Sequence, residues 1–270
     1  MSQDTQQDHI SKKRVVYTMP GVDAVTVRRD EEYRVTDGGT LTMDLYYPPD
    51  SKKGAPLPAV VIVAGYSDVG DRPRFGKFKE MGWSISWGQL MAASGMLAIT
   101  YTNREPATDI AALLQYVRRN AASLGVDENR IGVFAGSGNV PIALSVLMQE
   151  AMDYLKCAVL CYGFMLDLEG STAVAEAAKT YGFVNPCAGR SVDDLPRDIP
   201  LLIVRAAEEQ FPHLNEMIDR FVLNALARSL PVTLVNHPGP HAFDLTQNSE
   251  TARETIGQML AFLRFNLVER

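Results

Sequence analysis

A run of six apolar residues at positions 59–64, with the sequence AVVIVA, constrains the fold of this chain more than any other feature. A strand that is apolar at every position is typical of a parallel sheet covered on both faces. Short, mostly apolar runs recur at residues 96–101, 130–135, 157–162, 200–206 and 231–236. Patterns typical of helices lie between and after these runs, at residues 86–94, 108–124, 140–152, 213–229 and 250–270.

This alternation predicts an α/β fold: a doubly wound, mostly parallel sheet with helices on both faces. The N-terminal part differs, because β-branched and aromatic residues at 25–35 and 40–47 flank a DGG turn at residues 37–39, which predicts an antiparallel hairpin. We expect residues 14–270 to form a single domain after a polar tail at residues 1–13. Gly and Pro interrupt residues 166–198, which predicts a small cap or an interface in a homodimer.

Composition limits the classes of partner that we expect for this chain and the cellular compartment in which we expect it. The net charge of −6 argues against a phosphate backbone, so we expect no nucleic-acid partner. No apolar run approaches the roughly 18 residues that a membrane span requires, so we expect no membrane partner either. The N-terminal residues MSQDTQQDH lack the apolar stretch of a secretory signal, which predicts a cytoplasmic location.

The three cysteines, Cys157, Cys161 and Cys187, argue against a disulfide framework, because their number is odd. Cys157 and Cys161 lie in an apolar run and are expected to be buried packing residues. A metal site at this pair would need two further soft ligands, so we expect no metal there.

The first candidate for chemistry is Ser137, in the segment AGSGN at residues 135–139. Ligands of α/β sheets bind at the C-terminal ends of the strands, and this segment lies where a strand ends and a helix begins. A serine on such a sharp turn exposes its hydroxyl, and the backbone N–H of Gly138 is aimed at a developing oxyanion. The match to the pattern G-x-S-x-G is imperfect, because Ala135 and Asn139 replace the two outer glycines. The alternative is a glycine-rich turn without chemistry.

A base and an acid follow at later strand ends. His241 follows the last core strand in the loop PGPHAFD, and the strand at 200–206 runs into Glu208 and Glu209. A carboxylate at that strand end holds an imidazole in the required tautomer. The order serine, acid, histidine is the order of a known class of hydrolases. His237 lies four residues before His241, so a metal pair is an alternative, although a third ligand is missing.

On these segments, together with VAGY at 63–66 and GPHAF at 239–243, the chain resembles the α/β-hydrolase superfamily, in its dienelactone-hydrolase-like and prolyl-oligopeptidase-like serine esterase branch. The resemblance covers roughly residues 25–270. It implies Ser137 as the nucleophile, His241 as the base and Glu209 as the acid, with Glu208 as the alternative acid. It also implies the N–H of Tyr66 as the second oxyanion donor.

The implied activity is hydrolysis of a small-molecule carboxylic ester through an acyl-enzyme, without a metal or an organic cofactor. Thioesterase, lactonase or peptidase activity uses the same residues, and the sequence does not identify the natural substrate. We expect three aromatic side chains near the predicted loops, Trp83, Trp87 and Phe243, to line the substrate pocket. The alternative from another class is a non-catalytic α/β-hydrolase fold that binds a small molecule or a partner.

Overall fold

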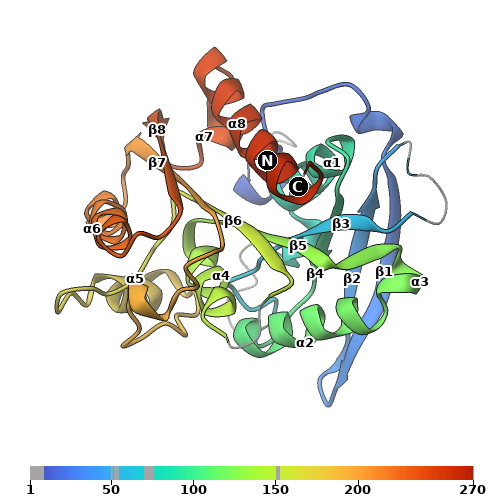
Figure 1. Cartoon of the computed structure of the whole chain (residues 1–270), viewed down its shortest axis with the longest axis horizontal. Coiled ribbons are helices and arrows are strands. Elements are labelled where there is room, and N and C mark those ends of the chain that lie inside the picture. The colour runs from blue at the N-terminus through green and yellow to red at the C-terminus, as the bar shows by residue number, and fades with distance from the viewer. Residues whose placement is uncertain (1–8, 50, 52–54, 70–75, 150–152, 270) are drawn as a thin grey trace, which may run out of the picture.

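The computed structural model describes residues 9–49, 51, 55–69, 76–149 and 153–269. Within them, eight strands form one sheet in the order β1-β2-β4-β3-β5-β6-β7-β8. Figure 1 shows this sheet running across the whole molecule, with β1 and β8 at its opposite edges. The strands are β1 (Thr26–Thr36), β2 (Gly39–Tyr47), β3 (Leu57–Ile62), β4 (Leu97–Tyr101), β5 (Val126–Gly136), β6 (Leu155–Cys161), β7 (Leu201–Glu208) and β8 (Val232–Pro240).

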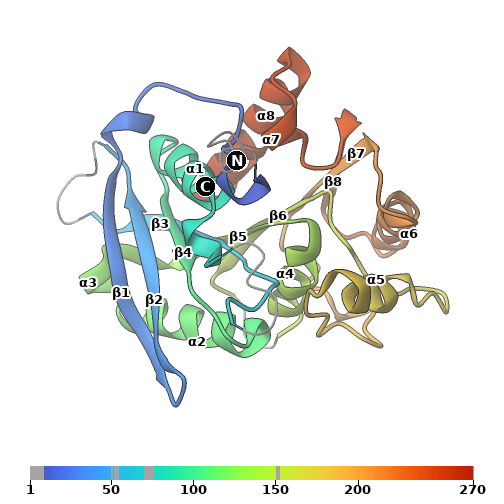
Figure 2. The same cartoon turned by 180° about the vertical axis from the view of Figure 1, so that it is seen from behind.

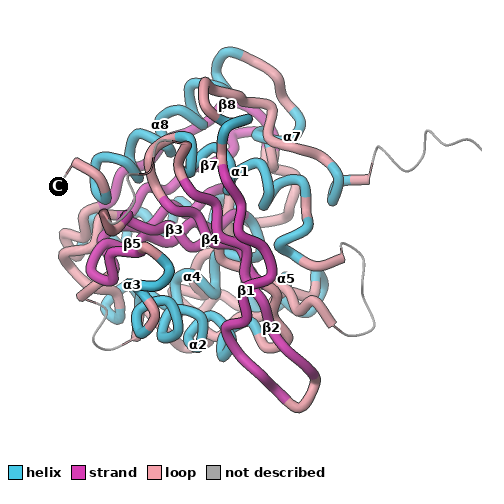
Figure 3. The backbone as a smooth tube through the Cα atoms, turned by 90° about the vertical axis from the view of Figure 1, so that its right-hand side faces the viewer, coloured by secondary structure: helices cyan, strands magenta, loops and turns pink. Residues whose placement is uncertain are grey.

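Strand directions match the predicted architecture. β2 pairs antiparallel with β1 and with β4, whereas every pair from β4 to β8 is parallel. The predicted N-terminal hairpin is therefore confirmed, and Figure 3 shows its tip extending away from the body of the molecule. β4 is buried at every position and β3 at every position after its first, which agrees with their apolar sequences.

Helices cover both faces of the sheet, as predicted. In Figures 1 and 2, α1 and α8 lie on one side of the sheet and α2 and α4 on the other. The helices are α1 (Gly82–Ala93), α2 (Pro106–Arg119), α3 (Ala121–Leu124), α4 (Val140–Leu147), α5 (Ala173–Tyr181), α6 (Leu214–Ala227), α7 (Phe243–Thr246) and α8 (Glu250–Leu267).

Several boundaries differ from the sequence prediction. The helix expected at 108–124 begins at Pro106, which suits a first helical position, and is divided at Asn120 into α2 and α3. β8 continues to Pro240 instead of ending at residue 236. The helix expected at 140–152 ends at Leu147, and residues 150–152 lie outside the described residues. α5 and α7 were not predicted, because they are short and lie among Gly and Pro residues.

Four further predictions concern the N-terminal tail, the cap, the cysteines and a membrane span. Residues 1–8 of the expected tail lie outside the described residues, whereas Ile10–Lys12 form a 3-10 turn, and the adjoining backbone packs against Gly82. The expected cap contains α5, next to β6 and β7 in the chain. Cys157 and Cys161 are buried, as expected, and Cys187 is buried as well; all three are free. Among the described helices, none has the length and apolarity needed to cross a membrane.

Candidate active site

Ser137 occupies a strained turn between β5 and α4. It opens the 3-10 turn η5 (Ser137–Asn139) with φ at +57°, a left-handed conformation that non-glycine residues adopt rarely. Such strain is stored at functional sites, where the surrounding structure compensates for it. The turn carries the hydroxyl beyond the C-terminal end of β5, where the predicted chemistry was expected.

Three side chains form a continuous hydrogen-bonded chain at this edge of the sheet. The Nε2 atom of His241 lies 2.8 Å from the Oγ of Ser137. Its Nδ1 atom lies 2.7 Å from the Oε2 of Glu209. The Glu209 side chain is 2% exposed and that of His241 is 13% exposed, so the acid is shielded while the imidazole stays open to a ligand. This geometry suits a nucleophile, a base and an orienting acid.

Backbone contacts separate Glu209 from Glu208. The Oε1 atom of Glu209 accepts hydrogen bonds from the N–H groups of Gln210 and Phe211 at 2.8 and 2.9 Å, which fixes the carboxylate with Oε2 facing His241. Glu208 is exposed and ends β7 opposite Pro240. The structure therefore brings Glu209, and not Glu208, to the imidazole.

Asn139 connects the turn at Ser137 to the loop after β3. Its Oδ1 accepts a hydrogen bond from the N–H of Gly65 at 2.7 Å, and its Nδ2 donates to the carbonyl of Gly136 at 2.8 Å. Gly65 must lack a side chain here, because a Cβ would lie 2.3 Å from the carbonyl oxygen of Gly138. Asn139 thus holds together two backbone segments that carry the predicted oxyanion donors. The sequence pattern, which favours glycine at this position, gave no sign of this role.

We expect Asn139→Gly to lower the free energy of unfolding by about 2–4 kcal/mol, because it leaves two buried backbone groups without partners. Urea denaturation measures the change. The exposed Asn129 is the matched control, and its replacement by glycine should cost less than about 1 kcal/mol. Equal effects at the two positions would contradict a bridging role for Asn139.

The two predicted oxyanion donors, Tyr66 and Gly138, lie next to each other. A Cβ built on Gly138 would be 2.3 Å from the Tyr66 hydroxyl oxygen and 2.8 Å from the ring of Phe183, so these two side chains cover the Gly138 backbone. Burial raises the pKa of Tyr66 to about 12, so the phenol stays protonated at neutral pH. The carbonyl of Gly65 accepts a hydrogen bond from the N–H of Val184 at 2.9 Å, which ties the segment at residues 166–198 to this loop.

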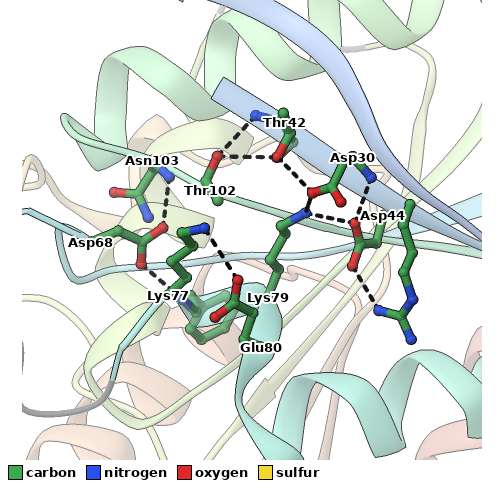
Figure 4. Close-up of polar contacts among 11 residues, drawn as sticks. Asp30, Thr42, Asp44, Asp68, Lys77, Lys79, Glu80, Thr102 and Asn103 are labelled. Carbon is green, nitrogen blue, oxygen red and sulfur yellow. Dashed lines mark hydrogen bonds and ion pairs between the residues drawn. The ribbon is translucent and has the colours of Figure 1, made fainter. Parts of the chain in front are cut away.

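Two sets of polar contacts, one around Asp68 and one around Lys79, support the same loop (Figure 4). Asp68 accepts hydrogen bonds from the backbone N–H groups of Phe78 and Asn103 at 2.8 and 2.9 Å, and burial raises its pKa to about 6. Lys79, which is 2% exposed, forms ion pairs with Asp30 and Asp44 of the N-terminal hairpin. The loop that carries Tyr66 is thereby fastened to β4 and to the hairpin.

The three aromatic residues predicted for the pocket lie behind the site instead. Trp83, Trp87 and Phe243 are 6%, 0% and 0% exposed and belong to the core. Both indole N–H groups donate to the carboxylate of Asp244. This placement corrects the prediction, because nearness in sequence to a loop does not determine the side of the sheet on which a side chain packs.

Other aromatic residues, which the sequence reasoning missed, lie beside the imidazole. The ring of Phe211 packs against His241 at a centroid distance of 4.6 Å, and Tyr181 packs against Phe211 at 4.9 Å. Phe164 packs against Phe183 at 4.8 Å, which extends this cluster into the segment at residues 166–198. Of these residues, only Phe211 could have been found from the sequence, because it lies two residues after the predicted acid, Glu209.

His237 does not take part in the site. Its Nδ1 lies 3.1 Å from the Oγ1 of Thr255 and its Nε2 lies 3.2 Å from the Oε1 of Gln247. The ring stacks on Phe243 at 3.7 Å, and burial lowers its pKa. Both nitrogens are thus occupied, so the metal pair with His241 is not formed. Within the described ranges, no cluster of three potential metal ligands is found.

Comparisons with known proteins show the fold. No protein-family model and no curated protein matches the chain. Among solved structures, a thermophilic esterase from Thermogutta terrifontis, Est2, has a TM-score of 0.65 at 19% identity, over 91% of this chain and 93% of the esterase. A mutant of the esterase rPPE has a TM-score of 0.69 at 15% identity, over 93% and 85%. A mutant of LAE6, an α/β hydrolase from the metagenome of Lake Arreo, has a TM-score of 0.66 at 17% identity, over 90% and 85%. The chain has the α/β-hydrolase fold.

Proposed function

We propose that this α/β-hydrolase-fold chain is a serine hydrolase that cleaves a carboxylic ester through an acyl-enzyme. The observation that carries the proposal is the hydrogen-bonded chain from Ser137 through His241 to Glu209. The strained backbone of Ser137 supports the proposal, because a turn that merely connects β5 to α4 does not need it. The shielded Glu209 carboxylate supports it as well, because such a turn does not need a buried acid nearby.

Acylation begins with proton transfer. The Oγ of Ser137 attacks the ester carbonyl while its proton passes to the Nε2 of His241. Glu209 holds the imidazole through Nδ1 and stabilises the imidazolium that forms. The tetrahedral intermediate then collapses, the C–O bond to the alcohol breaks, and the Nε2 proton leaves with the alcohol.

The negative charge of the intermediate requires donors on the opposite side. We assign this role to the backbone N–H groups of Tyr66 and Gly138, which belong to the two segments that the Gly65–Asn139 hydrogen bond joins. One such donor contributes roughly 3–4 kcal/mol to the transition state. Water then attacks the acyl group, with His241 again as the base, and releases the acid and the free serine. These steps use only groups of the chain and water.

A fluorophosphonate probe tests the proposal. We expect stoichiometric labelling of Ser137, located by peptide mass spectrometry, together with hydrolysis of simple carboxylic esters. Est2 of Thermogutta terrifontis has been captured phosphonylated by sarin and with butyrate bound, which supports this choice of probe. Folded protein that neither reacts with the probe nor cleaves any ester would overturn the proposal.

We propose that the leaving alcohol binds on the side of His241 where Phe211 lies. Because His241 protonates that alcohol, Phe211, which packs against the imidazole, would contact the alcohol part of the ester. Tyr181 is 37% exposed and continues the wall outward from Phe211. We therefore infer a preference for esters of apolar or aromatic alcohols over esters of small polar ones.

Phe211→Ala should reveal this preference. We expect kcat/KM for phenyl or benzyl esters to fall roughly tenfold to a hundredfold, since a buried aromatic contact contributes about 1.5–3 kcal/mol. Methyl esters should lose less than about threefold, because they do not reach the wall. Phe265, which is 50% exposed on α8, is the matched control. Equal losses for large and small alcohols would contradict the assignment.

Related points remain proposals. Thioesters, lactones or peptides would use the same residues, and a panel graded by leaving group distinguishes them. The non-catalytic alternative rested on Asn139 and on Ala64 before Gly65, and the two hydrogen bonds of Asn139 give its side chain a structural role, which weakens the first of these reasons. We also propose membership of the dienelactone-hydrolase-like and prolyl-oligopeptidase-like branch, a cytoplasmic location and a homodimer.

A further inference from the structure

A second carboxylate lies behind the catalytic histidine. Asp244 belongs to α7, three residues after His241, and is fully buried. Its Oδ2 accepts hydrogen bonds from the indole N–H groups of Trp83 and Trp87, each at 2.9 Å. Its Oδ1 accepts one from the Tyr162 hydroxyl at 2.7 Å. Within the described residues, no cation pairs with this carboxylate.

The surrounding donors suit an anion. An indole N–H only donates, so both tryptophans require an acceptor at this position. A carboxylate that accepts several hydrogen bonds remains charged more easily when it is buried. Burial raises the pKa of Asp244, and the three donors and His241 oppose that rise. Burying a carboxylate costs free energy that an apolar side chain would not cost, even when three donors surround it. Filling the core therefore does not by itself explain Asp244.

Tyr162 links this carboxylate to the imidazole. Its ring lies 4.7 Å from the ring of His241, and its hydroxyl carries the hydrogen bond to Asp244. Tyr162 follows β6 with φ at +37°, and Ala242, next to His241, has φ at +53°. Strained backbone persists only where the surrounding packing fixes it, so the Tyr162 ring and the His241 loop are held in place by their neighbours.

The same layer supports the backbone before the nucleophile. A Cβ on Gly136 would lie 3.2 Å from the Trp83 indole and 3.3 Å from the Tyr162 ring. Trp83 and Tyr162 therefore pack directly behind the residue that precedes Ser137, and both donate to Asp244. The carboxylate is thus linked to the backbone before the nucleophile and to the base, although it touches neither the substrate nor the reacting atoms.

We propose that Asp244 is a positioning residue that acts through Tyr162 on His241 and stabilises the positive charge that His241 acquires from the Ser137 proton. This inference rests on the proposed hydrolase function. In the low-dielectric interior, a fixed negative charge favours the imidazolium without forming a direct hydrogen bond to it. Glu209 thus orients the ring, and Asp244 adds a second, deeper negative charge.

The other groups around the two side chains do not supply this charge. The titratable and charged groups that face His241 or Asp244 come from η5, the loop after β7, β6 with its following residue, β8 and α7; they are Ser137, Glu209, Cys161, Tyr162, His237 and Asp244. Burial and the nearby Asp244 raise the pKa values of Cys161 and Tyr162, and burial lowers the pKa of His237, so all three stay neutral. Glu209 and Asp244 are the two carboxylates of this set.

Asp244→Asn removes the charge while keeping the shape. The amide oxygen accepts both indole N–H groups, and the amide nitrogen donates to the Tyr162 oxygen. The chain has four histidines, so selectively labelled imidazoles are resolved by NMR, and His241→Gln identifies the signal of His241. Without the negative charge the imidazolium loses its proton more easily, so we expect the titration midpoint of His241 to fall by roughly one pH unit.

Activity provides the second readout. The acidic limb of the kcat/KM profile reports the free-enzyme base, so it should move to lower pH by the same amount. The plateau value of kcat/KM should fall roughly tenfold, since one pKa unit corresponds to a factor of ten. Asp109→Asn is the matched control. Asp109 on α2 is also buried, but its carboxylate forms an ion pair with Arg34 on β1 and does not contact Tyr162 or His241. It should leave the His241 midpoint unchanged.

The outcomes separate the inference from the proposed function. A folded Asp244→Asn variant whose His241 midpoint moves by less than about 0.2 units overturns the inference, whether or not the enzyme is active. If that variant does not fold, Glu209→Gln provides the test, because a charged Asp244 should keep the midpoint of its His241 at or above the ordinary value of a histidine. A midpoint below that ordinary value would show that no second carboxylate acts there. Failure of the proposed function is seen separately, as wild-type protein that the fluorophosphonate does not label.

Discussion

Replacing Ser137 by alanine should lower kcat for ester hydrolysis by about 10⁴–10⁶-fold, with little change in stability. The substitution removes the only atom that forms the acyl bond, and it relieves the left-handed strain only slightly because alanine keeps a Cβ. His241→Ala should cause a loss of the same order, since the two residues act as a unit and their effects are not additive. Steady-state kinetics with an activated ester measure both losses.

A serine elsewhere in the same region is the control for this result. Ser145 lies on α4, and its hydroxyl donates to the carbonyl of Ile142. Ser145→Ala should keep kcat within about twofold of the wild-type value, because it removes one local hydrogen bond that contributes about 1 kcal/mol to stability. Substantial hydrolysis by purified Ser137→Ala would mean that another group performs the attack.

Glu209→Gln should lower kcat by about 10³–10⁴-fold, by analogy with the loss seen when the acid of a Ser-His-Asp triad becomes an amide. An amide at this position presents either a donor or a neutral oxygen to Nδ1 of His241. In either case it no longer stabilises the tautomer and charge that the reaction requires. The backbone bonds of Gln210 and Phe211 to the side chain should hold the amide in the same place.

The neighbouring acid provides a closely matched comparison. Glu208→Gln makes the same chemical change one residue earlier, on an exposed side chain, and should alter kcat by less than about twofold. The ratio of the two kcat values is therefore the decisive quantity. If Glu208→Gln proved the more damaging change, the acid would be assigned to the wrong residue and the loop would have to rearrange in the active enzyme.

The sequence was sufficient to predict the strands of the sheet, because each strand is marked by a local pattern of residues. The apolar run at 59–64 marked a strand buried on both faces, and β3 is such a strand, although it begins two residues earlier, at Leu57. The DGG turn placed the antiparallel hairpin. The short elements were missed because α7 has only four residues, too few to show a helical period.

The sequence by itself determined that Ser137, an acid at 208–209 and His241 follow three different strands, because strand ends are marked by composition and parallel strands end at one edge of the sheet. It did not determine which glutamate turns toward His241, since adjacent residues of a loop point in different directions according to their backbone contacts. It also gave no role to Asn139 or Asp244. Their partners lie 74 and 161 residues away in the chain, at Gly65 and Trp83. Only the tertiary structure brings such groups within hydrogen-bonding distance, because a buried polar group is matched by whatever donor or acceptor the packing places beside it.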